Sequence, residues 1–226
     1  MLLKDKVAFI TGAASGLGRA TAENFIAAGA NVMIFDLNEE NAEKAASELG
    51  DNATFAAGDV ANADAVGAAI DKTLSQYGAL HININSAGIG AASRTLGRDG
   101  PMDLKMFEFV IRVNLVGTFN CLRLCANAMQ SNEPVTEDGE RGVIVNVASV
   151  AAFDGQIGQA AYSASKAGVA GMTLPIARDL SRSGIRIATI APGIFETPMM
   201  KFAPPQVRQP LVDMTQFPKR LGNPSE

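Results

Sequence analysis

Three residues in the second half of the chain have types and a spacing that suit proton transfer. Tyr162 and Lys166 lie four residues apart in the segment "QAAYSASK", and Ser149 precedes them. Residues i and i+4 share one face of a helix, so the lysine can approach the tyrosine hydroxyl. A nearby ammonium favours the phenolate, which predicts a tyrosine pKa below its usual value of about 10. With Ser149 as a hydrogen-bond donor to a substrate oxygen, the pattern predicts a tyrosine acid/base that acts on an alcohol or a carbonyl.

A glycine-rich loop near the start of the chain has the composition of a phosphate-binding turn. In "TGAASGLG", Thr11–Gly18, glycines stand at positions 12, 16 and 18. They allow a tight turn and the close approach of a ligand, and the helix expected after them offers free N–H groups to a pyrophosphate. The spacing differs from the common G-x-G-x-x-G pattern, but the loop lies between an expected strand and an expected helix. That context predicts a dinucleotide site.

Asp36 closes the second expected strand, in "MIFDLNEE". A carboxylate at this point can accept hydrogen bonds from both hydroxyls of an adenosine ribose, although an aspartate here can also serve as a helix N-cap. It would repel a 2′-phosphate, because two unit charges about 4 Å apart near a protein surface interact by about 4 kcal/mol before screening. The residue therefore predicts NAD in preference to NADP. Asp59 and Val60, which end the third strand, are expected to flank the adenine.

Short apolar runs alternate with longer amphipathic segments along the whole chain. Near-continuous apolar runs suit strands that are covered on both faces, and strand–helix alternation implies right-handed crossovers. The sequence therefore predicts a single α/β domain over residues 1–226, with a Rossmann-type doubly wound parallel sheet and helices on both faces. The expected strands are 7–11, 31–35, 53–59, 80–85, 142–149 and 185–192, and the expected helices are 16–29, 38–50, 62–77, 104–130 and 159–183.

Composition and charge exclude several classes of protein. The net charge of −4 and the absence of basic runs argue against a nucleic-acid partner. No run of 18 uninterrupted apolar residues and no signal-peptide pattern is present, so we expect a cytoplasmic protein without a membrane partner. Cys121 and Cys125 lie in an apolar segment without a histidine cluster, which predicts buried side chains and no metal site. The lone histidine, His81, is expected to be structural.

With these motifs in hand, the chain resembles the short-chain dehydrogenase/reductase family over essentially its whole length. The segments that carry the resemblance are "TGAASGLG", Asp59, "NSAG" (Asn85–Gly88), Asn114 in "VNLVGTF", Ser149, "YSASK" and "PGIFETP" (Pro192–Pro198). The resemblance implies a catalytic tetrad of Asn114, Ser149, Tyr162 and Lys166. In that tetrad Asn114 anchors a water for proton relay, and Lys166 also holds the nicotinamide ribose.

The glycine-loop chemistry and the resemblance together define the expected NAD contacts. Pro192–Thr197 is expected at the nicotinamide, with Thr197 near its carboxamide. The full set is Gly12, Ser15, Gly16, Leu17, Gly18, Asp36, Asp59, Val60, Asn85, Ser86, Ala87, Gly88, Tyr162, Lys166, Pro192, Gly193, Phe195 and Thr197.

Within that family, the block from Ala148 to Leu180 is similar to the type 2 3-hydroxyacyl-CoA dehydrogenases. This similarity implies hydride transfer between NAD and a secondary alcohol or ketone, with 3-hydroxyacyl-CoA oxidised to 3-oxoacyl-CoA. It adds Gln156 and Gln159 to Ser149 as expected substrate contacts. Two alternatives stay open. One is an NADPH-dependent 3-oxoacyl-carrier-protein reductase, and the other is a cofactor-binding but inactive truncated form.

Four further expectations concern shape and assembly. The connections 88–103 and 130–142 are long and polar enough to be surface loops, and Pro175 is expected to kink its helix. Apolar side chains between 194 and 217, Phe202 among them, are expected to form a wall over an acyl chain. The resemblance implies a homo-oligomer, a dimer through helices 104–130 and 159–183, with a tetramer less secure. Family members usually continue beyond the equivalent of Glu226, so we expect the C-terminal end to be truncated, without the usual last strand.

Overall fold

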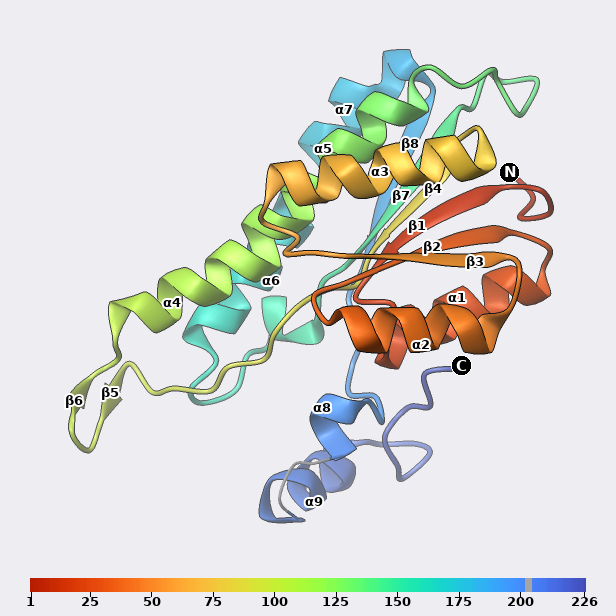
Figure 1. The fold of residues 1–226 in the computed structure, drawn as a ribbon. Coiled ribbons are helices and arrows are strands. Elements are labelled where there is room, and N and C mark those ends of the chain that lie inside the picture. Colours follow the sequence, from red (N-terminus) through yellow and green to blue (C-terminus); the bar gives the residue numbers. More distant parts are fainter. Residues whose placement is uncertain (202–204) are drawn as a thin grey trace.

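The computed structural model describes residues 1–201 and 205–226, and its centre is a six-stranded parallel sheet (Figure 1). The strand order is β3-β2-β1-β4-β7-β8, so the chain reverses direction across the sheet between β1 and β4. The predicted doubly wound parallel sheet is confirmed. All six carboxyl ends meet at one edge, where such sheets bind ligands. The strands are β1 (Val7–Thr11), β2 (Asn31–Asp36), β3 (Ala53–Ala57), β4 (Ile82–Asn85), β7 (Gly142–Val147) and β8 (Ile185–Ile190).

Helices cover both faces of this sheet and enclose two apolar cores. One core packs α1 and α2 against side chains such as Ile10 and Ile34. The other packs α3, α5 and α7 against the opposite face, around Phe9 and Ile144. The two groups of helices lie on opposite sides of the sheet in Figure 1. The α-helices that precede β8 in the chain are α1 (Gly16–Ala27), α2 (Glu39–Leu49), α3 (Ala63–Tyr77), α4 (Leu104–Ile111), α5 (Gly117–Met129), α6 (Ala160–Gly171) and α7 (Thr173–Leu180).

The two longest predicted helices are each interrupted in the structure. The segment predicted as one helix from 104 to 130 contains a π-helical turn, η1 (Arg112–Val116), between α4 and α5. The segment predicted from 159 to 183 breaks at Met172 between α6 and α7 and ends in a 3-10 turn, η3 (Ser181–Ser183). Pro175 has no N–H to donate to the preceding turn, so the predicted kink appears as a break.

The two long connections differ from each other. The connection 88–103 is not simply a loop, because β5 (Leu96–Gly97) and β6 (Gly100–Pro101) pair as a small antiparallel hairpin. Its sequence lacks the alternation that predicts a strand. Residues 98 and 99 form the turn between the two short pieces, and Gly100 follows that turn at φ +126°. The connection 130–142 is described throughout and forms turns before β7 begins.

After β8 the chain leaves the sheet through α8 (Pro198–Lys201) and α9 (Pro205–Met214). Phe202, which we expected in an apolar wall over the substrate, lies outside the described residues. Near the end of the chain, Gly222 pairs with the segment that follows β8. Its N–H donates to the carbonyl of Ile194 at 2.9 Å, and its carbonyl accepts from the N–H of Glu196 at 2.8 Å.

Length and composition alone would allow the helical run Leu104–Met129 to cross a membrane, since its most apolar window has a mean hydropathy of 1.3. Half of that window is buried inside the protein. Its buried side chains, Cys121 and Met129 among them, belong to the core against the sheet. A core helix passes the same test, so this feature is weak evidence for a membrane span.

Candidate active site

The glycine loop packs directly against the segment that follows β4. Backbone atoms lie so close there that a side chain on Gly12 or Gly18 would collide with them. Gly12 and Gly16 have φ values of +64° and +57°. A Cβ on Gly12 would lie 2.8 Å from the Cα of Ala87, and one on Gly18 would lie 2.4 Å from the carbonyl oxygen of Gly12. Ser15 begins α1 without a side-chain capping bond among the described residues, so its hydroxyl remains available. The structure thus brings the predicted loop and the predicted "NSAG" segment together at the carboxyl edge.

Thr11, which our sequence interpretation did not select, ties these two segments together. Its buried hydroxyl accepts hydrogen bonds from the N–H groups of Ser86 and Ala87, at 3.2 and 3.0 Å. The side chain of Asn85 turns away from this surface. It donates to Asn83 Oδ1 and Asn146 Oδ1 inside the protein, which leaves the Asn85 backbone as the part that can face a cofactor. The sequence did contain a signal for this role of Thr11: a threonine is the last residue of the strand that precedes the glycine loop.

Asp36 ends β2 beside the glycine loop, as predicted. Its Oδ2 atom accepts a hydrogen bond from the N–H of Ala14 at 3.1 Å, and Oδ1 accepts one from Asn38 at 3.4 Å. It is Asn38, and not Asp36, whose side chain caps α2. The helix-cap alternative for Asp36 is therefore excluded, and the carboxylate lies where it can meet a ribose bound over the loop.

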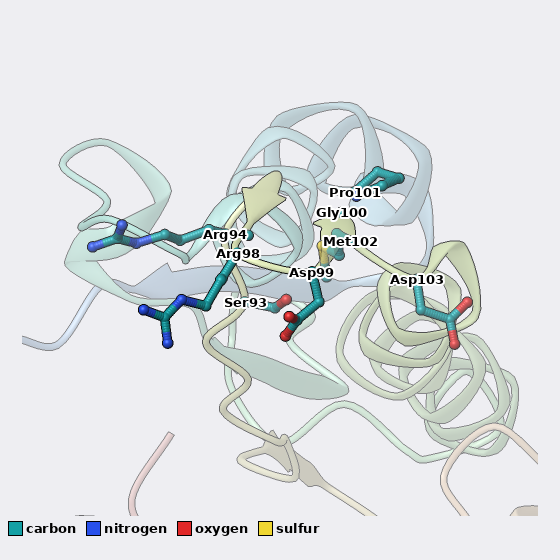
Figure 2. Close-up of a pocket in the computed structure, with 9 residues that line it drawn as sticks. Ser93, Arg94, Arg98, Asp99, Gly100, Pro101, Met102 and Asp103 are labelled. Atoms are coloured by element: carbon teal, nitrogen blue, oxygen red, sulfur yellow. The ribbon is translucent and has the colours of Figure 1, made fainter.

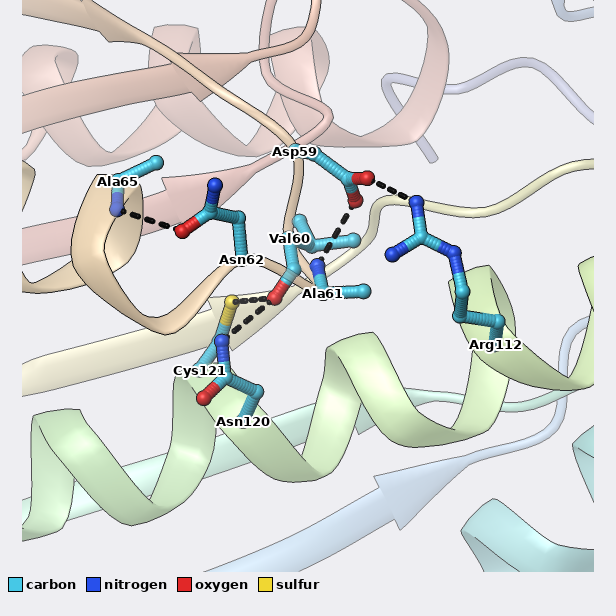
Figure 3. A network of polar contacts seen from close by, with 8 residues as sticks. All are labelled: Asp59, Val60, Ala61, Asn62, Ala65, Arg112, Asn120 and Cys121. Atoms are coloured by element: carbon cyan, nitrogen blue, oxygen red, sulfur yellow. Dashed lines mark hydrogen bonds and ion pairs between the residues drawn. The ribbon is translucent and has the colours of Figure 1, made fainter.

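Asp59 and Val60 form the next turn along this edge, in the network drawn in Figure 3. One oxygen of Asp59 accepts from the N–H of Ala61 at 2.8 Å, and the other forms an ion pair with Arg112. The carbonyl of Val60 accepts from the side chain of Asn120 at 2.8 Å. The sequence interpretation missed Arg112 and Asn120, because their partners are more than 50 residues away in the chain.

Asn114 lies in the π-helical turn and is fully buried. Its Oδ1 accepts from the N–H of Ile89 at 2.8 Å, and its Nδ2 donates to the Ile89 carbonyl at 3.0 Å and to Ser165 Oγ at 3.1 Å. Ser165 in turn donates to the carbonyl of Tyr162 at 2.7 Å. The side-chain amide of Asn114 is thus committed to fixing the chain beside Gly88 and the tyrosine helix, and Ser165 joins the residues that sequence reasoning missed.

Ser149, Tyr162 and Lys166 meet where β7 ends and α6 begins. The Lys166 ammonium donates to the carbonyl of Val147 at 2.8 Å and lies 5.8 Å from the centre of the Tyr162 ring. Ser149 caps the short helix η2 (Val150–Ala152) by accepting from the N–H of Ala151 at 3.2 Å. The predicted trio is therefore assembled.

The electrostatics of this trio correct one prediction. Burial raises the pKa of Tyr162 above its ordinary value of 10, and only the Ser149 hydroxyl acts in the opposite direction. Lys166 is itself buried, and burial lowers its pKa to about 8. We expected the lysine to lower the tyrosine pKa, and this was wrong for the protein as it stands. Burial disfavours the charged phenolate, and the ammonium is bound to the Val147 carbonyl, 5.8 Å from the ring centre.

The segment after β8 closes the site on the remaining side. The carbonyl of Pro192 accepts from the N–H of Val150 at 3.0 Å, which fixes this segment next to Ser149. Thr197 packs over Gly16, and its Cγ2 lies 3.4 Å from the position of a Cβ there. Gly193 lies between them and is exposed. The Phe195 backbone is instead engaged with Gly222.

The glutamines expected at the substrate lie in the loop before α6. Gln159 Oε1 accepts from the N–H of Gln156 at 2.8 Å, which leaves the Gln159 amide nitrogen free to turn outward. The carbonyl of Gly158 in this loop accepts from the N–H of Ser93 at 2.8 Å. Through that bond the β5–β6 hairpin, which carries a pocket of about 320 Å³ lined by Arg94 and Arg98 (Figure 2), joins the rim of the site.

A parallel sheet of this order, with a glycine loop after β1 and a Ser–Tyr–Lys group after β7, defines a nucleotide-dependent oxidoreductase of the Rossmann class. The short chain dehydrogenase family model matches residues 6–208. The chain belongs to that family, and it is an oxidoreductase.

Individual relatives cover almost the whole chain. It is 52% identical to a 3-hydroxyacyl-CoA dehydrogenase type-2 of Drosophila melanogaster, over 100% of this chain and 89% of the relative. The crystal structure of a 3-hydroxyacyl-CoA dehydrogenase type-2 from Mycobacterium avium superposes with a TM-score of 0.91 at 42% identity, over 99% of this chain and 87% of that one. A 3-ketoacyl-(acyl-carrier-protein) reductase from Brucella melitensis, complexed with NADH, gives 0.85 at 30% identity, over the same shares of the two chains.

Proposed function

We propose that the protein is an NAD-dependent dehydrogenase that interconverts 3-hydroxyacyl-CoA and 3-oxoacyl-CoA. The observation that carries the proposal is the assembled group of Ser149, Tyr162 and Lys166 at the carboxyl edge of the sheet, beside the glycine loop. The names of the fly and mycobacterial relatives support the substrate class.

The nicotinamide ring supplies hydride transfer when the cofactor is bound. Tyr162 exchanges the proton: its phenol protonates the developing alkoxide in reduction, and its phenolate takes the hydroxyl proton in oxidation. Ser149 donates a hydrogen bond to the same substrate oxygen. Lys166 holds positive charge beside the ring and binds the ribose. Asn114 anchors the relay by which that proton leaves, and it fixes the turn after β4 through Ile89.

The raised pKa of Tyr162 gives the two directions of reaction different pH dependences. The phenol form persists at neutral pH, so reduction has its acid ready. Oxidation requires the phenolate, which becomes more abundant as the pH rises. We therefore expect alcohol oxidation to accelerate from pH 7 to pH 9 while carbonyl reduction does not.

NAD is proposed over NADP because the Asp36 carboxylate lies free of α2 and beside the loop. The solved reductase that shares this fold is complexed with NADH. The proposed contacts are those predicted from the sequence, with Asn85 acting through its backbone. The carrier-protein reductase alternative receives less support, because a 2′-phosphate would meet the Asp36 charge.

Two guanidinium groups at the β5–β6 hairpin, in a pocket that Asp99 and Asp103 also line, support a CoA thioester as the substrate. Arg94 and Arg98 extend from the hairpin to the same side in Figure 2. CoA carries phosphates that guanidinium groups bind well. Because the hairpin is bonded to Gly158, a CoA held there would have its acyl end near Gln156 and Gln159.

A homodimer through α4, α5 and the α6–α7 segment is also proposed. Phe109, Val116 and Phe119 are separated by seven and three residues and are each about half exposed, at 48%, 48% and 47%. A stripe of this kind on one helix face is typical of a protein interface. Sedimentation of the purified protein tests it, and a monomer at micromolar concentration would contradict it.

The decisive experiment compares wild-type protein with the Tyr162→Phe variant on a panel of 3-hydroxyacyl-CoA substrates with NAD. We expect wild-type turnover, and a variant that binds NADH with wild-type affinity but loses at least roughly 100-fold in kcat, as the loss of a general acid/base requires. Retained turnover by Tyr162→Phe would contradict the acid/base role. NADH binding without turnover by the wild-type protein would favour the inactive alternative.

A further inference from the structure

The turn between β3 and α3, residues 58–62, is fastened to a helix that lies far from it in the sequence. Figure 3 shows the attachment: Arg112 reaches Asp59 from one end, and Asn120 reaches the carbonyl of Val60 from the other. Between them, Gly117 lies so close that a Cβ would be 2.5 Å from Val60 Cγ2. Asn120 and Gly117 hold the turn by packing and a neutral hydrogen bond, whereas Arg112 acts on the carboxylate itself.

Arg112 places a positive charge beside the Asp59 carboxylate, in the turn after β3. The N–H of Gly58 donates to the carbonyl of Asp36 at 2.9 Å, so this turn follows β3 next to the end of β2, where Asp36 lies. The guanidinium of Arg19 at the same end is engaged with Glu23 and Glu48. A dinucleotide brings a negatively charged pyrophosphate to the nearby glycine loop, so an additional cation at this edge of the sheet lowers the electrostatic cost of binding.

From this arrangement we infer that Arg112 is a positioning residue for the adenosine half of the cofactor. It acts by fixing the Asp59 carboxylate and by offsetting its charge. The pair is partly exposed, at 51% for Arg112 and 30% for Asp59, so solvent moderates its strength. Arg112 is also the first residue of the π-helical turn that contains Asn114. The same turn of helix therefore contributes to both halves of the cofactor site.

The inference rests on the proposed dinucleotide cofactor, and its test uses binding and not turnover. NADH binding is measured by fluorescence titration for wild type, Arg112→Gln and Arg112→Lys. We expect Arg112→Gln to weaken NADH roughly threefold to fivefold, the upper part of the range for a partly exposed ion pair, and Arg112→Lys to recover most of the affinity. Arg186→Gln is the control. It removes an exposed, ion-paired arginine at the amino end of β8, away from the proposed cofactor site, and should bind NADH with wild-type affinity.

Cofactor fragments separate a positioning role from general damage to the site. AMP contains the adenosine half alone, and reduced nicotinamide mononucleotide contains the other half. Arg112→Gln should weaken AMP by the same factor as NADH and leave the mononucleotide unchanged. Equal weakening of both fragments, or of neither, would overturn the inference.

A double-mutant cycle tests whether the effect passes through Asp59. In the background of Asp59→Asn, Arg112→Gln should cost clearly less affinity than it does alone. A full effect in that background overturns the inference and assigns Arg112 a different route of action. If wild-type protein bound no NADH, the proposed function would fail together with this inference; wild-type binding that Arg112→Gln leaves unchanged overturns the inference alone.

Discussion

Replacing Gly18 by alanine should damage both folding and cofactor binding, through one methyl group. The new Cβ would lie 2.4 Å from the carbonyl oxygen of Gly12, 2.9 Å from its carbonyl carbon and 3.0 Å from the Cα of Ala13. These are backbone atoms, so no side chain can turn aside. Ordinary contact begins at 3.4 Å, so the glycine loop must move by about 1 Å relative to the start of α1.

The expected magnitude follows from that displacement. Overlap in a packed region costs about 1–3 kcal/mol, which corresponds to a decrease in Tm of roughly 2–12 °C for a chain of this size. The loop shift also moves N–H groups that bind the pyrophosphate. The loss of one charge-assisted hydrogen bond costs about 1.5–3 kcal/mol, so the NADH dissociation constant should rise roughly tenfold to a hundredfold.

Gly67→Ala is the matched control, because it makes the same chemical change in the interior of α3. No atom lies within 4 Å of a Cβ at that position among the described residues. Alanine favours a helix over glycine by about 0.5–1 kcal/mol, so this variant should raise Tm by roughly 1–4 °C and leave NADH binding unchanged. Thermal unfolding and fluorescence titration of both variants give the comparison. A Gly18→Ala protein as stable as Gly67→Ala, with wild-type affinity, would refute the reasoning.

Three more outcomes are expected. Asp36→Ser should reduce the preference for NAD over NADP by at least roughly tenfold, measured as the ratio of kcat/KM values, because the repelling carboxylate is gone; an unchanged ratio would locate selectivity elsewhere. Burial, with help from Lys6, lowers the pKa of His81, and its Nδ1 accepts from the N–H of Val7, so the unfolded chain takes up the proton first. Stability should therefore fall as the pH decreases through about 6.5, and urea titrations of His81→Gln should show a weaker loss. Cys121 and Cys125 are buried with raised pKa values, so neither should react with iodoacetamide before unfolding; labelling of native protein would contradict their burial.

Local patterns in the sequence were sufficient for most of the fold. Each strand is a short apolar run, and each helix repeats apolar residues at helical spacing, so the alternation predicted the sheet and its two helical layers. The ends of the strands were less well predicted: β8 stops at Ile190, although the apolar run continues to Pro192. Hydrogen bonding to β7 sets that boundary, and the paired residues of β7 lie 43 positions earlier in the chain.

The predicted site residues come from patterns that are each short enough to be seen along the chain. Three such short patterns are the glycine loop, the Tyr162–Lys166 spacing and the position of Asp36 at the end of a strand. The structure places the members of these patterns at one edge of the sheet, because parallel strands bring their carboxyl ends together. Thr11 and Ser165 lie inside two of these patterns but were not selected, and Arg112 lies in none of them. Each acts on a partner more distant in the chain or through a backbone contact.

The sequence by itself determined the class of fold and the identities of the groups that do chemistry, because both depend on residue type and on spacing within one element. Tertiary structure decided how those groups are tuned. It turned a helix into a π-helical turn around Asn114, and it bound Lys166 to the carbonyl of Val147. It also raised the pKa of Tyr162 where spacing alone predicted a lower one. The physical reason is desolvation, which depends on every atom packed around a group and not on its neighbours in the chain.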